Sequence, residues 1–98
     1  MYRVQLTADF KTDLRGVWMY IDQQLHSPGT AAKLRAQALQ TAFSLREFPL
    51  RFALTYVRAE VRSVPVDNFL IFYTVDEAAQ IVTLLRFLYG ASDWQNNV

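Results

Sequence analysis

The sequence predicts an α+β fold, in which an N-terminal helical hairpin covers an antiparallel sheet and the chain order is strand, helix, helix, strand, strand, strand. Three observations support this prediction. Apolar residues recur at helical spacing in the first half of the chain, the period shortens to two from Phe52, and two apolar runs then flank an acidic turn. With no linker or internal repeat, residues 1–98 are expected to form one domain.

The first strand and helix are expected at Tyr2–Leu6 and from Thr7 onward. Tyr2–Leu6 alternates in polarity, as a half-buried strand does. Thr7 is suited to cap a helix, and Asp9 in the first turn suits the positive end of the helix dipole. The buried stripe of this helix is expected to comprise Phe10, Leu14, Val17, Trp18, Ile21 and Leu25.

A second helix is expected after the break at Ser27–Thr30. Either Ser27 caps it with Pro28 in the first turn, or Thr30 caps a slightly later start. The helix should run to about Arg46, and Pro49 prevents its continuation because the residue before a proline avoids the helical region. Its inward face is predicted to be Ala32, Ala36, Leu39, Phe43 and Leu45.

Three strands are expected in the second half of the chain. Alternation from Phe52 to Arg62 predicts a strand with one face in water. Val64–Asn68 is then a connection, and Phe69–Val75 and Ile81–Tyr89 form a hairpin around Asp76 and Glu77. The short links predict antiparallel pairing of these strands.

Composition narrows the classes of function. The chain has no cysteine and a single histidine, His26, so we expect no disulfide, metal site or histidine-based triad, and no cofactor. It lacks the apolar run of a signal peptide or of a membrane span. The absence of cysteine fits a reducing cytoplasm, which is the expected location. The net charge of +1 is low for a nucleic-acid binder, so RNA binding would depend on local clusters. Arg46, Arg51 and Arg58 are the candidate RNA-binding residues, with an ordinary solvated strand face as the alternative.

Arg62, Arg86 and Tyr89 are the candidate catalytic residues. Arg86 lies in an apolar strand, where a charge is costly to bury unless it is paired or has a task. RNA can be cleaved without a metal when arginines stabilise the phosphate anion and a tyrosine transfers or orients a proton. On an ideal strand Arg86 and Tyr89 face opposite sides, so a bulge or the strand end near Gly90 would have to redirect Tyr89. The alternative is that Arg86 pairs with a nearby acid and Tyr89 packs on the core.

The chain resembles the RelE/ParE family of bacterial toxins over nearly its whole length. The segments that carry the resemblance are Arg62–Tyr73 (R-S-V-P-V-D-N-F-L-I-F-Y) and Leu85–Trp94 (L-R-F-L-Y-G-A-S-D-W). The opening Y-R-V-Q-L-T-A-D-F-K-T-D-L is similar to the family's first strand and helix. Ser27-Pro28 followed by Ala32, and Leu45 with Phe48-Pro49, are similar to the landmarks of its helical hairpin.

The resemblance implies the toxin of a type II toxin–antitoxin pair, held in a hetero-oligomer by a cognate antitoxin. It implies one of two actions: mRNA cleavage on the ribosome, which we take as the leading interpretation, or ParE-like inhibition of DNA gyrase by binding without catalysis. Whether the chain is an enzyme therefore stays open. Arg62, Arg86 and Tyr89 match catalytic positions of the endonucleases. Two departures bear on these assignments. ParE-like endings usually have histidine at Tyr89 and arginine at Ser92, which weakens the gyrase assignment. RelE-like enzymes often carry more lysine and arginine in the middle strands, whereas no lysine follows Lys33 here, which weakens the endonuclease assignment.

Overall fold

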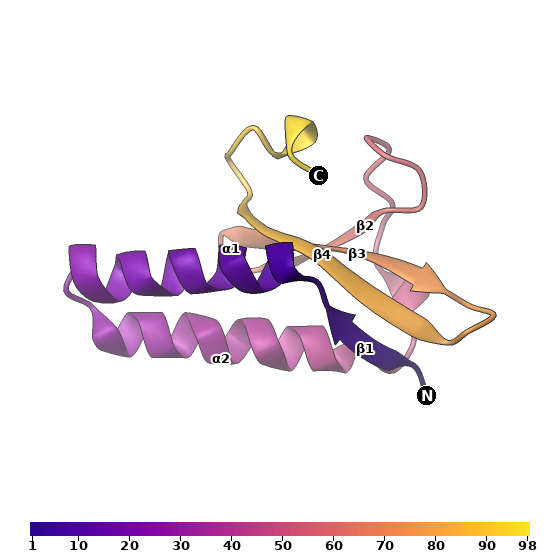
Figure 1. Ribbon diagram of the computed structural model, residues 1–98, viewed down its shortest axis with the longest axis horizontal. Coiled ribbons are helices and arrows are strands. Elements are labelled where there is room, and N and C mark those ends of the chain that lie inside the picture. Colours follow the sequence, from indigo (N-terminus) through magenta and orange to yellow (C-terminus); the bar gives the residue numbers. More distant parts are fainter.

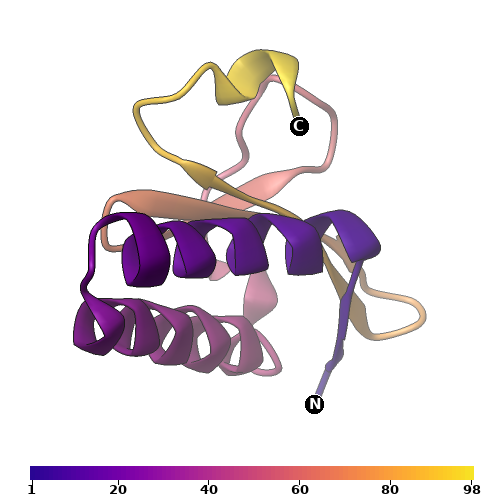
Figure 2. The ribbon, with the colours of Figure 1, turned by 60° about the vertical axis from the view of Figure 1, so that its left-hand side comes forward.

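The structure is a computed structural model that describes all residues, 1–98. Two helices lie side by side on one face of a sheet, and two segments outside the sheet, the irregular residues 52–61 and residues 90–98 with a 3-10 turn at Trp94–Asn96, lie on the other face (Figures 1 and 2). Neither helix is long and apolar enough to cross a membrane. The elements are β1 (Arg3–Leu6), α1 (Ala8–Met19), a π-helical turn (Tyr20–Gln24), α2 (Pro28–Ser44), β2 (Arg62–Val66), β3 (Phe69–Asp76) and β4 (Ile81–Tyr89).

The sheet has the strand order β1-β4-β3-β2. β2 pairs with β3 and β3 with β4 in antiparallel fashion, while β1 runs parallel to β4 with Arg3 opposite Ile81 and Leu6 opposite Leu84. The predicted fold class and the predicted order of helices and strands are therefore confirmed. The parallel pair arises because the last strand returns between β1 and β3, so that the first strand becomes an edge.

α1 begins where the sequence predicts. The Thr7 hydroxyl accepts a hydrogen bond from Phe10 N at 3.1 Å and so caps the first turn. Phe10 and Leu14 are buried, and Val17, Trp18 and Ile21 are partly buried, as expected of the stripe. Leu25 is the exception. It is 54% exposed because the helix has already ended and the backbone turns away at His26, whose φ is 52°.

α2 starts at Pro28 with Ser27 at the cap position, which decides between the two predicted starts, and it ends at Ser44 rather than Arg46. The predicted inward face was wrong by about one residue. Ala32, Ala36 and Phe43 are exposed. The buried face comprises Ala31, Leu34, Ala38, Ala42 and Leu45, with Leu39 partly buried. Alanines occur on the exposed side of this helix as well as on its buried side, so alanine did not mark the face.

The predicted strand Phe52–Arg62 was also wrong. This stretch is irregular, with a single bridge between Leu54 and Arg62, and the strand occupies Arg62–Val66, where a connection was expected. Tyr56 and Glu60 have φ values of 62° and 67°, which no extended strand allows. Pro65 is tolerated because β2 is an edge strand.

The core lies between the helices and the sheet. Phe10 and Leu34 from the helices pack with Ile71, Tyr73 and Phe87 from the central strands. The Tyr73 hydroxyl donates a hydrogen bond to Pro49 O at 2.6 Å, which ties the chain after α2 to the sheet. Burial raises the pKa of Tyr73 to about 12, because the phenolate would lose its hydration there.

Candidate functional site

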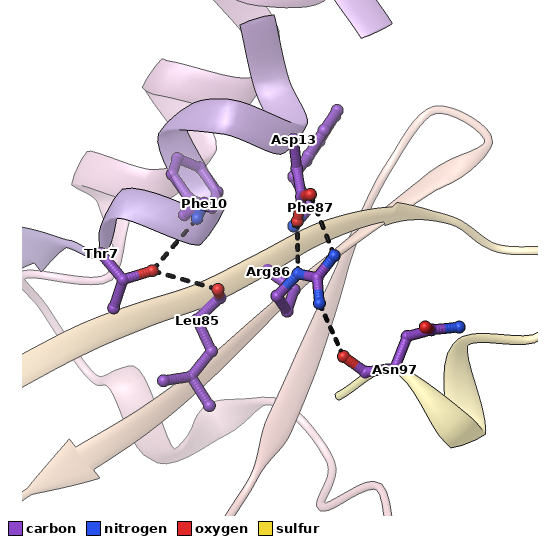
Figure 3. Close-up of polar contacts among 7 residues, drawn as sticks. All are labelled: Thr7, Phe10, Asp13, Leu85, Arg86, Phe87 and Asn97. Carbon is purple, nitrogen blue, oxygen red and sulfur yellow. Dashed lines mark hydrogen bonds and ion pairs between the residues drawn. The ribbon is translucent and has the colours of Figure 1, made fainter. Parts of the chain in front are cut away.

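Arg86 is held by α1 and by the C-terminal segment (Figure 3). Its Nε donates to Asp13 Oδ2 at 2.6 Å and its Nη2 to Asp13 Oδ1 at 3.1 Å, a bidentate ion pair. Its Nη1 donates to Asn97 O at 2.8 Å. Hydrogen bonding to Asp13 raises the pKa of Arg86. Arg86 therefore pairs with a nearby acid, as the alternative interpretation of the sequence expected.

The ion pair closes an edge of the sheet. β1 pairs with β4 only from Ile81 to Leu84, so the next residues of β4 have no neighbouring strand on that side. Side chains from the start of α1 take over there (Figure 3): the Thr7 hydroxyl donates to Leu85 O at 3.1 Å, and Phe87 N donates to Asp13 Oδ2 at 3.0 Å. Asp13 thus satisfies both a backbone N–H and the guanidinium of Arg86, and an otherwise open strand edge is sealed.

Tyr89 does not face Arg86. A register shift between β3 and β4 pairs Phe72 with Arg86 and Tyr73 with Leu84, so the bulge falls at Leu85, before both candidate residues. It cannot change their relative parity. The ring centres of Tyr89 and Phe69 lie 5.5 Å apart on the helix side of the sheet. Tyr89 is 49% exposed. The redirection that catalysis would need is absent at this strand end.

Arg62 lies at the far end of the hairpin from Tyr89. It pairs with Tyr73, whereas Tyr89 pairs with Phe69, four residues away along β3, which is roughly 13 Å at 3.3 Å per residue. Its Nη1 donates to Phe52 O at 2.6 Å and to Leu50 O at 3.2 Å. The structure therefore does not bring Arg62, Arg86 and Tyr89 together at one point, and their catalytic role stays a prediction.

The three candidate RNA-binding arginines fall in two places. Arg46 and Arg51 line one hollow beside Phe48 at the end of α2, where Arg51 donates to Glu47 O at 2.6 Å and Arg46 donates to Phe43 O at 3.0 Å. Arg58 is exposed in the irregular segment 52–61, and its side chain has no hydrogen-bond or ion-pair partner. A continuous basic strip along one strand is not formed, because the strand that would carry it is not there.

Sequence reasoning missed two residues of this site. Asp13 was not singled out, because it lies beside the apolar stripe of α1, where an acid is ordinary, and nothing in the sequence places it against β4. The second is Trp94, whose ring lies 5.1 Å from that of the buried Phe72 on the face of the sheet away from the helices. With Arg86 bound to Asn97 O, this contact fastens the C-terminal segment to the sheet.

The comparisons with known proteins agree with this architecture. A family model described as "ParE toxin of type II toxin-antitoxin system, parDE" matches residues 4–94. The chain belongs to the ParE toxin family. The resemblance to RelE/ParE toxins is thereby confirmed, and no curated protein matches the sequence.

Two solved structures share the fold of this ParE family member. One is from the chromosomal ParDE toxin–antitoxin system of P. aeruginosa, with a TM-score of 0.76 and 17% identity, covering 91% of this chain and 96% of that one. The other is from the toxin–antitoxin complex RelBE2 of Mycobacterium tuberculosis, with a TM-score of 0.68 and 21% identity, covering 90% of this chain and 96% of that one. At these identities the likeness establishes the fold and leaves the mechanism to the site itself.

Proposed function

We propose that this ParE family member is a toxin that inhibits DNA gyrase through surface contact, without catalysis, and that a cognate antitoxin silences it. The observation that carries the proposal is that Arg62 and Arg86, the two arginines on the sheet, are already hydrogen-bonded within the fold. The family model that matches nearly the whole chain is that of ParE rather than of the ribosome-dependent endonucleases, which favours the same direction.

An endonuclease of the expected kind needs free guanidinium groups beside a proton-transfer residue. Stabilising a phosphate anion requires N–H donors aimed at the position where charge develops. Arg86 already directs three donor nitrogens at Asp13 and Asn97, and Arg62 directs Nη1 at two backbone carbonyls. Tyr89 lies on the other face from Arg86. Engaging RNA would therefore mean breaking structural bonds first, whereas contact with a protein target leaves them intact.

Antitoxin binding is part of the proposal. Both structural neighbours come from toxin–antitoxin systems, and the second is described as a toxin–antitoxin complex. The cytoplasm, which holds gyrase and the antitoxin's site of synthesis, is the proposed location. A small chain with several exposed apolar side chains, among them Phe48 at 80% and Tyr56 at 90% exposure, also has surface available for protein partners.

The test is a paired assay on one preparation of the purified protein. Supercoiling by gyrase is measured beside cleavage of mRNA on programmed ribosomes, with toxin premixed with its antitoxin as the control in each. The proposal predicts inhibited supercoiling, intact mRNA, and loss of inhibition in the premixed control. Intact supercoiling together with cleaved mRNA would reject it and restore mRNA cleavage as the function.

A further inference from the structure

Phe48, in the turn that follows α2, is exposed and strained at the same time. It precedes Pro49, and its backbone has φ 51° and ψ 52°, in the left-handed region. That region is unfavourable for a bulky side chain, and a residue before proline is normally pushed towards an extended conformation. The side chain is 80% exposed, so it gains little burial in return. Backbone strain of this kind persists where the surroundings impose it, and it occurs preferentially at functional sites.

Hydrogen bonds from two strands and from the turn itself impose this conformation. From β1, Tyr2 N donates to the carbonyl two residues before Phe48, at 2.8 Å. From β3, the buried Tyr73 hydroxyl donates to the carbonyl of the residue after Phe48, at 2.6 Å. Arg51 Nη1 donates to the carbonyl of Phe48 at 3.1 Å and to that of the preceding residue at 2.6 Å. The backbone that carries the ring is therefore fixed before a partner binds, which lowers the entropy cost of binding.

Phe48 is flanked by two hollows of the surface and lines both of them. Exposed apolar side chains extend these hollows, Leu50 on one side and Phe43 on the other. Arg46 and Arg51 also line both, together with a single glutamate one residue before Phe48. Aromatic and arginine side chains are enriched at protein–protein interfaces. The turn thus combines a protruding aromatic ring with an excess of positive charge.

Shape and charge together define the partner. A protruding ring fits a concave, largely apolar site, which is the usual form of the binding sites of enzymes. The single ion pair of the structure joins Arg86 to Asp13, so neither arginine beside Phe48 is bound to an acid within the fold. Both can face acidic side chains of a partner. We propose that Phe48 is the anchor through which the toxin binds gyrase, with its ring in an apolar hollow of that enzyme and Arg46 beside a carboxylate at the rim. This rests on the proposed function, which supplies gyrase as the target.

A single-stranded nucleic acid fits this surface less well than a protein does. Bases also stack on aromatic rings beside arginines. However, two arginines against one glutamate leave one positive charge in the turn, and the whole chain carries only +1. A phosphate backbone is held by many more cations than that. The apolar side chains around Phe48 favour a protein surface instead.

The experiment titrates gyrase supercoiling with toxin variants that separate the ring from the strain. Phe48→Asn removes the ring and places in the left-handed region a residue that tolerates it. Its melting temperature should equal or exceed that of the wild type, while its inhibition of gyrase should be about 10- to 100-fold weaker. Phe48→Tyr, which keeps the ring, should recover most of the inhibition. A residue that serves only the fold would show the opposite pattern, a lower melting temperature with inhibition lost in proportion.

Two controls are matched to the two parts of the surface. Tyr20→Ala removes another exposed aromatic ring, in the π-helical turn at the other end of the helical hairpin (Figure 1). Lys33→Glu reverses an exposed charge in α2, to compare with Arg46→Glu. Arg46→Glu should weaken inhibition about 10-fold at low salt and less at high salt, because the charge acts mainly on association. Both controls should stay within about 3-fold of the wild type.

The inference is overturned if Phe48→Asn inhibits gyrase as well as the wild type does, or if a fall in its melting temperature accounts for the loss. It is also overturned if inhibition is kept while binding of a single-stranded DNA oligonucleotide, or of the full-length protein encoded by the adjacent reading frame, is lost. If the unmodified toxin leaves supercoiling intact, the gyrase proposal fails and the anchor role of Phe48 fails with it. A failure confined to the variants leaves the gyrase proposal standing.

Discussion

Replacing Arg86 with alanine removes the side chain that joins β4 to α1 and to the C-terminal segment. The variant loses both bonds to Asp13 and the bond to Asn97 O. Asp13 then keeps only the N–H of Phe87, in a position where its side chain is 14% exposed. A carboxylate that loses its counter-charge at such a site destabilises the folded state.

The size of the effect follows from the exposure of the pair. Exposed ion pairs contribute up to about 1 kcal/mol, whereas breaking a fully buried pair costs about 3–5 kcal/mol. The Arg86 and Asp13 side chains are 27% and 14% exposed, which places the expected loss between these limits, at about 2 kcal/mol. For a domain of this size, that corresponds to a fall in melting temperature of roughly 8–16 °C.

The assay is thermal unfolding, run beside Arg58→Ala as a control. Arg58 is an exposed arginine without a partner, so its removal should change the free energy of unfolding by less than about 0.5 kcal/mol. A double-mutant cycle with Asp13→Ala isolates the coupling between the two charges. If Arg86→Ala melts like the wild type yet abolishes toxicity, the structural assignment is refuted and Arg86 returns to the catalytic candidates.

Three further outcomes are expected. The pKa of Tyr73 is about 12 in the folded protein and about 10 in the unfolded chain, so its contribution to stability is present below pH 10 and is lost between pH 10 and 12. The free energy of unfolding of the wild type should therefore fall by about 2 kcal/mol over this range, while that of Tyr73→Phe should show no such fall; equal curves would contradict this expectation. Because the Trp94 ring packs on buried Phe72, Trp94→Ala should lower the free energy of unfolding by about 1–2 kcal/mol and speed hydrogen exchange of the C-terminal segment. Unchanged exchange would contradict this expectation. Tyr89→Phe should keep gyrase inhibition within about 5-fold, since the exposed hydroxyl has no partner in the fold; a loss of 100-fold or more would point to proton transfer.

The fold was predictable wherever local chemistry and tertiary packing agree. The Thr7 cap, the stripe that begins at Phe10 and the apolar hairpin each combine a local signal with a burial pattern that has one solution. The face of α2 was not predictable in this way, because alanines occur on both its buried and its exposed side, and contact with α1 and the sheet selects between them.

Segment 52–61 was mispredicted for a different reason. Its alternation has the period of a strand, but left-handed residues at Tyr56 and Glu60 break the extended backbone, and alternation carries no information about φ. The partner of Arg86 was also not predictable from the sequence. Sequence showed that Arg86 needs a partner or a task, and only the packing of α1 against the β4 edge identified Asp13 as that partner.

Stoichiometry tests the central claim, inhibition by contact, most directly. Gyrase at a fixed concentration well above the dissociation constant is titrated with the purified toxin, and supercoiling is followed to completion. An inhibitor that acts by binding must reach a break at about one toxin per binding site on gyrase, and mRNA on programmed ribosomes must stay intact over the same range. An enzyme turns over, so complete cleavage of mRNA by toxin far below the ribosome concentration, with supercoiling unaffected, would contradict the account.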